Sequence, residues 1–97
     1  MKYLQLTLKK KWFDLILSGE KKEEYREIKP YWEKRLVGKK YDRIIFRNGY
    51  GSHAPWFAIE LKGITQGVGK GEWGAEEGKQ YFVLSLGEII NTKNIDK

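Results

Sequence analysis

The first nineteen residues place the strongest constraint on the fold. Residues 2–8, KYLQLTL, alternate between apolar and polar side chains, and this period of two predicts a half-buried strand. A helix is expected directly after it, over roughly residues 9–18, with Thr7 as its cap and Gly19 as its stop. Its apolar residues recur at helical spacing on one face: Trp12, Phe13, Ile16 and Leu17. The chain therefore starts as a strand followed by an amphipathic helix.

The rest of the chain continues in short elements. The patterns predict an extended segment over 20–28, a short helix from Pro30 that ends at Gly38, and strands over 41–48, 56–65 and 79–87. Residues 63–78 hold six of the eleven glycines and are expected to form a long loop. The order β-α-β-α-β-β-β predicts one α+β domain over 1–97. We expect a small barrel of about five to six mostly antiparallel strands, flanked by two or three short helices.

Composition excludes several classes of chemistry. The chain has no cysteine and a single His, which removes disulfides, thiolate catalysis and the usual zinc sites. We therefore expect no metal and no cofactor. GVGKG at 67–71 is a weak candidate for a phosphate-binding loop, because the stretch after it is acidic and interrupted by glycines and is therefore a poor helix. No apolar run approaches the length of a membrane span, and no apolar leader is visible, so we expect a cytoplasmic protein without membrane contact.

The positive charge lies in the first half of the chain. Residues 1–43 hold ten Lys and three Arg against seven acidic residues, whereas residues 44–97 are balanced, and the net charge is +6. One interpretation is a face that binds a polyanion; the other is a solubilising lysine-rich surface. Lys9, Lys10 and Lys11 open the first helix, where the helix dipole disfavours cations. An anionic ligand near that turn would explain them, and three solvated lysines would be the simpler alternative.

The stretch SGEKKEEYREI, residues 18–28, carries the densest charge pattern. As a strand it would place Lys22, Glu24 and Arg26 on one face, with the last two about 7 Å apart. Such a carboxylate–guanidinium pair could orient a base edge or a phosphate. A solvated strand face is the alternative that spacing alone favours.

The same region resembles a known family. From LTLKKKWFDLILSGEKKEEYR, the chain is similar to the ASCH domain (activating signal cointegrator homology) of the PUA-like superfamily. The family pattern has a lysine at the helix entry, here Lys9, and a Gly-x-Lys-x-x-Glu-x-Arg signature, here Gly19, Lys21, Glu24 and Arg26. Later segments, FRNGYGS and AIELKGI, follow the family's strand order without diagnostic residues.

The resemblance implies a PUA-like barrel that binds RNA or a nucleotide in a basic cleft. Lys9, Lys21 and Arg26 would meet a phosphate or ring, and Glu24 would read a base edge or hold Arg26. The expected rim is Arg47, Asn48, Tyr50 and Trp56. The alternative is catalysis by Lys21 and Glu24, in a hydrolase of modified nucleosides similar to an N4-acylcytidine amidohydrolase, or in a ribonuclease.

One observation bears on that alternative. The family's amidohydrolases carry a threonine where this chain has Glu24, and a carboxylate is not a hydroxyl nucleophile, although it can act as a general base. A third reading is a protein-interaction module with ordinary surface charges. The sequence leaves the oligomeric state open.

Overall fold

A single five-stranded mixed sheet forms the body of the protein. The structure is a computed structural model that describes residues 1–95; the last two residues of the predicted domain 1–97 lie outside the described part. The strand order in the sheet is β1-β3-β4-β5-β2. The elements are β1 Tyr3–Thr7, α1 Lys10–Leu17, β2 Glu23–Glu27, α2 Pro30–Leu36, β3 Arg43–Arg47, β4 Trp56–Val68, the 3-10 turn η1 Gly71–Trp73, and β5 Gln80–Lys93.

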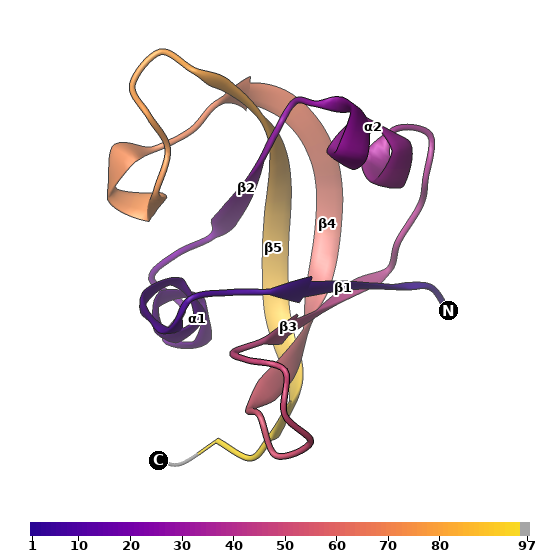
Figure 1. Ribbon diagram of the computed structural model, residues 1–97, viewed down its shortest axis with the longest axis vertical. Helices are drawn as coiled ribbons and strands as arrows, with labels where there is room; N and C mark the ends of the chain where they lie inside the picture. Colours follow the sequence, from indigo (N-terminus) through magenta and orange to yellow (C-terminus); the bar gives the residue numbers. More distant parts are fainter. Residues whose placement is uncertain (96–97) are drawn as a thin grey trace.

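The sheet curls strongly into a half-barrel (Figure 1). β1 pairs parallel with β3, and every other pairing is antiparallel. β4 and β5 are long and bend together, and their pairing shifts register between Ala58 and Gly63, as β-bulges do. The predicted α+β order with mostly antiparallel strands and two short helices is confirmed. β1 and β2 end the strand order, and they do not pair with each other in the described part of the chain.

The hydrophobic core lies on the concave side of this sheet. The alternation in β1 is confirmed, because Leu4, Leu6 and Leu8 are buried whereas Tyr3 and Gln5 are exposed. α1 adds Phe13 and Ile16, and aromatic contacts join Phe13, Phe46 and Phe57 near the centre. The remaining buried members of this cluster are Leu36, Ile44, Ile59, Leu61, Phe82, Leu84 and Leu86. The radius of gyration of 13.0 Å is that of a compact domain of about 100 residues.

Three local predictions need correction. Lys9, not Thr7, is the N-cap residue of α1, because Thr7 remains the last residue of β1. β4 runs on to Val68, so the predicted loop over 63–78 shrinks to the residues around η1. β5 also continues to Lys93, beyond the predicted end at residue 87. The long β4–β5 pairing keeps both strands extended across their glycines, because each strand continues to hydrogen-bond with the other beyond them.

The predicted helix ends are confirmed. Gly19 and Gly38 follow α1 and α2 with φ values of +86° and +71°, a left-handed conformation that glycine adopts at low cost. Within residues 1–95, no helix is long and apolar enough to cross a membrane.

Candidate functional site

The turn after α1 directs the signature lysine into the protein. The backbone N–H groups of Glu20 and Lys21 both donate to the Leu15 carbonyl, at 3.1 and 3.0 Å, and tighten the turn around Gly19. The Leu86 N–H then donates to the Lys22 carbonyl, which joins the chain to β5 just before β2 begins. Lys21 therefore points inward, and Lys22 is exposed.

Lys21, Glu24 and Arg26 form one buried charge network. The Lys21 Nζ lies 3.1 Å from Glu24 Oε1 and also donates to the Glu23 carbonyl. The Arg26 Nη2 lies 2.6 Å from Glu24 Oε2. The exposed fractions of the three side chains are 0%, 9% and 18%. The Glu24 carboxylate thus bridges two cations, and the predicted coupling of Glu24 with Arg26 is confirmed.

Two predictions about this face had different outcomes. Spacing grouped Lys22 with Glu24 and Arg26, and this is wrong, because β2 begins only at Glu23 and the alternation does not extend back to Lys22. The family signature pointed to Lys21 instead, and this is the lysine that meets Glu24.

Aromatic rings surround both cations of the network. The Lys21 Nζ lies 5.5 Å from the centre of the Trp12 ring and 5.0 Å from that of Tyr25. The Arg26 guanidinium lies 5.0 Å from the centre of the Trp32 ring. Burial among these rings lowers the pKa of Lys21, although the charge of Glu24 and its hydrogen bond act in the opposite direction.

The glycine-rich segment packs against two of these rings. The Lys70 N–H donates to the Tyr25 hydroxyl at 3.0 Å, and that hydroxyl donates to Glu23 Oε1 at 2.8 Å. A Cβ on Gly69 would lie 2.7 Å from the Tyr25 ring, and one on Gly74 would lie 3.1 Å from Trp12. Burial is the main reason that the pKa of Tyr25 is raised to about 12.

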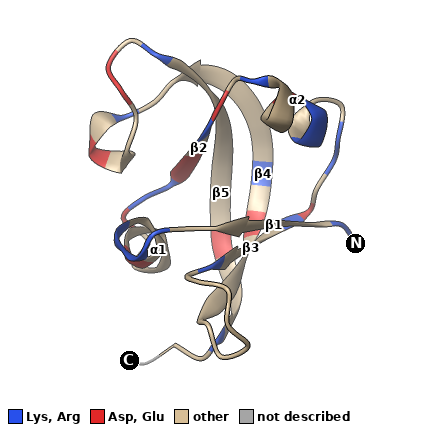
Figure 2. Ribbon diagram, in the orientation of Figure 1, with Lys and Arg blue, Asp and Glu red and all other residues tan. Residues whose placement is uncertain are grey.

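The network also reaches the opposite edge of the sheet. Arg26 Nη2 lies 3.5 Å from the Thr7 carbonyl, at the end of β1. The next carbonyl along the chain, that of Leu8, accepts a hydrogen bond from Asn48 Nδ2 at 3.0 Å. Lys9 follows with an exposed side chain. Figure 2 shows the blue of basic residues on the ribbon of α1. The structure therefore brings three of the predicted binding residues, Lys9, Arg26 and Asn48, to one short backbone segment.

The other predicted rim residues lie at the loop after β3. The Arg47 Nη2 donates to the Gly51 carbonyl at 2.8 Å, Tyr50 is 88% exposed, and Trp56 lies opposite Arg47 in the β3–β4 pairing. Within residues 1–95, no hydrogen bond or ion pair joins them to the buried network. Their role in binding stays a prediction.

Sequence reasoning missed the surroundings of the network. Trp12 and Trp32 pack against the core, and they also lie over Lys21 and Arg26. Tyr25 lies over Lys21 as well. No short motif signals these contacts, because they join α1, β2 and α2 through the tertiary fold.

The larger cavities lie elsewhere. Lys21 lines a cavity of about 200 Å³ beside Gly19 and Ile59. Cavities of about 700 and 710 Å³ are lined by other residues, and the first of these lies beside α2. Among the described residues, no group of three or more His, Cys, Asp or Glu is placed to hold a metal ion.

Comparison with known proteins adds no relative. No family model, no curated protein and no solved structure matches the chain. The ASCH resemblance therefore stays a prediction that depends on the five motif residues.

Proposed function

We propose that the protein binds RNA or a nucleotide at the surface formed by Arg26, Trp32 and the end of β1. The observation that carries the proposal is the arrangement of the Arg26 side chain. Glu24 holds it, Trp32 lies against it, and its Nε is buried without a hydrogen-bond partner in the described part of the chain. A guanidinium fixed in this way is suited to a phosphate or a base ring.

The burial of this network supports a functional role. Replacing a buried ion pair with apolar residues is often neutral or stabilising, so stability alone is a weak reason to keep three ionisable groups inside a small domain. The exposed Lys9 lies beside the same segment, and the first half of the chain carries the excess positive charge. Polyanion binding uses all of these features.

The proposal divides the roles of the signature residues. The side chain of Lys21 is fully buried, so it positions Glu24 rather than meeting the ligand. Glu24 in turn holds Arg26, which is the partly exposed member of the three. Lys9 and Asn48 would contact the backbone of the ligand. We propose that binding takes place in the cytoplasm, as expected above.

The test is fluorescence anisotropy with a labelled single-stranded RNA of about ten nucleotides. Affinity should fall steeply with salt, and Lys9→Gln should reduce the slope of log affinity against log salt by about 0.7, one phosphate contact on a single strand. Lys2→Gln, at the far end of β1, is the matched control and should leave the slope unchanged. Salt-independent binding, or equal slopes for the two variants, would refute the proposal.

A hydrolase of modified nucleosides is the second candidate. One observation favours it: Lys21 has a lowered pKa and lies beside a carboxylate, as catalytic lysines do. Catalysis would require the segment over Tyr25 and Trp12 to open, because Lys21 is closed to solvent. Turnover of an N4-acylated cytidine that Glu24→Gln abolishes would support it, and no turnover by the wild-type protein would count against it.

A further inference from the structure

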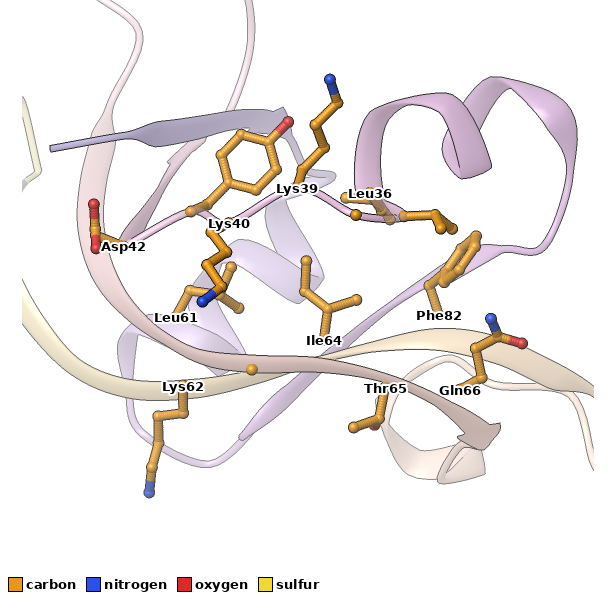
Figure 3. A pocket seen from close by; sticks show the side chains of 14 residues that line it. Leu36, Lys39, Lys40, Asp42, Leu61, Lys62, Ile64, Thr65, Gln66 and Phe82 are labelled. Atoms are coloured by element: carbon orange, nitrogen blue, oxygen red, sulfur yellow. The ribbon is translucent and has the colours of Figure 1, made fainter.

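A cavity of about 700 Å³ separates α2 from β4 (Figure 3). One wall is formed by residues 36–42, the end of α2 and the segment that leads toward β3. The other wall is formed by residues 61–66 of β4, and Phe82 closes the floor. Neither Glu24 nor Arg26 lines this cavity, and Phe82 lies opposite Arg26 in the β2–β5 pairing.

Half of β4 has a free edge at this cavity. β3 pairs with β4 only from Trp56 to Glu60, and the Leu61 N–H makes one more bond, to the Asp42 carbonyl. From there to Val68, β5 is the only strand that pairs with β4 in the described part of the chain. The backbone groups on the other side of residues 62–68 are therefore available to another strand.

The cavity follows this edge. In Figure 3, Ile64 points into the space between the two walls, whereas Lys62 and Thr65 point to the opposite side of β4. All three nevertheless line the same cavity. Residues whose side chains point away from a space can still border it through their backbone, so the cavity runs along the backbone of β4.

The lining is apolar at the floor and basic at the rim. Leu36, Leu61 and Phe82 are buried, and Ile64 packs against them. The rim carries three lysines and a single carboxylate: Lys39, Lys40, Lys62 and Asp42. None of the three lysines forms an ion pair within residues 1–95. An occupant of this cavity would therefore gain from negative charge.

We infer that the free edge of β4 binds an extended, acidic segment of a partner protein by strand addition. The partner's backbone would pair with residues 62–68, its alternate apolar side chains would meet Ile64 and Phe82, and its carboxylates would face Lys62, with Lys40 adding positive charge at the rim. A second copy of this chain is a poor occupant, because it would bring the same lysines against the same rim. This inference does not depend on the nucleotide-binding proposal.

The test uses the full chain and a fluorescein-labelled peptide of about eight residues that alternates Glu with Val, a length typical of a strand. We expect saturable binding by anisotropy. The double variant Lys40→Glu/Lys62→Glu should weaken it about tenfold or more by charge reversal. Lys11→Glu, an exposed charge reversal on α1, is the matched control and should leave the affinity unchanged. A peptide that is N-methylated at alternate residues loses backbone donors and should not bind.

Four results would overturn the inference. They are no saturable binding, equal binding of the N-methylated peptide, displacement of the peptide by single-stranded RNA, and a dimer in analytical ultracentrifugation that Lys40→Glu/Lys62→Glu abolishes. The third would assign the cavity to nucleic acid and the fourth to a second copy. The RNA titration of Lys9→Gln reports on a different surface, so each proposal can fail without the other.

Discussion

Removing the charge of Glu24 is the most direct perturbation of the buried network. In Glu24→Gln an amide replaces the carboxylate at nearly the same volume, so packing is kept while the shared anion is lost. The Lys21 Nζ and the Arg26 Nη2 would then face a neutral group from 3.1 and 2.6 Å. Both cations would lose the carboxylate that pairs with them.

The expected cost follows from the burial of the three side chains. Removing one partner from a buried ion pair typically costs about 3–5 kcal/mol, because the remaining charge is left uncompensated. Lys21 is fully buried and Arg26 is 18% exposed, so this range applies to the first cation more than to the second. A domain of this size has about 5–15 kcal/mol of stability in total, so the variant should lose a large part of it.

Urea unfolding followed by tryptophan fluorescence measures this loss. Glu24→Gln should lower the urea midpoint strongly with an unchanged m-value. Glu27→Gln, on the same strand but with an exposed carboxylate, is the matched control and should move the midpoint little. In Lys21→Met/Glu24→Leu the buried Lys21–Glu24 pair becomes apolar, so this variant should recover the part of the loss that Lys21 causes, whereas Arg26 still lacks its carboxylate. If Glu24→Gln lowers the free energy of unfolding by less than about 1 kcal/mol, the reasoning is refuted, because a loss of that size is typical of a solvent-exposed ion pair.

Three further variants test other parts of the structure. The folded pKa of Tyr25, about 12, exceeds its ordinary value of 10.0, so the unfolding free energy should fall as pH rises through this window. In Tyr25→Phe the unfolding free energy should fall less between pH 10 and pH 12, and urea midpoints measured at these two pH values test this. Gly69→Ala would place its Cβ 2.6 Å from that of Ala75 and should cost about 1–3 kcal/mol in urea unfolding, whereas Gly71→Ala meets nothing within 4 Å and should cost much less. Leu84→Ala should cost about 2–5 kcal/mol in the same assay, because Leu84 is fully buried in the core; an unchanged midpoint would contradict its packing.

The local part of the fold could be predicted from the sequence because local rules decide it. The leucines of β1 alternate, and Gly19 ends α1 in a left-handed conformation that glycine adopts readily. The extent of β4 could not be predicted in this way. Gly63 and Gly67 weaken the strand pattern, yet the ladder with β5 carries the strand to Val68. Strand pairing is a non-local contribution that a window of residues does not contain.

The candidate site was predictable only in part, for a related reason. The spacing along β2 correctly coupled Glu24 with Arg26, because a period of two operates within a regular strand. It failed for Lys22, because the strand does not yet exist at that residue. The contacts of Trp12 and Trp32 with the cations depend on how α1 and α2 pack beside β2, which no spacing encodes.

The order of burial along the network also restricts how binding could work. The exposed fraction of the side chain rises from 0% in Lys21 through 9% in Glu24 to 18% in Arg26. The Glu24 carboxylate therefore links a buried cation to one that reaches the surface. A ligand phosphate at Arg26 would compete with Glu24 for the guanidinium, and Lys21 would then be the cation that stays paired with the Glu24 carboxylate. Lys21 is fixed by the turn around Gly19 and by the rings of Trp12 and Tyr25. Arg26 can therefore loosen its bond to Glu24 without leaving that carboxylate buried and unpaired. A guanidinium that stabilises the fold can also bind a ligand only under this condition.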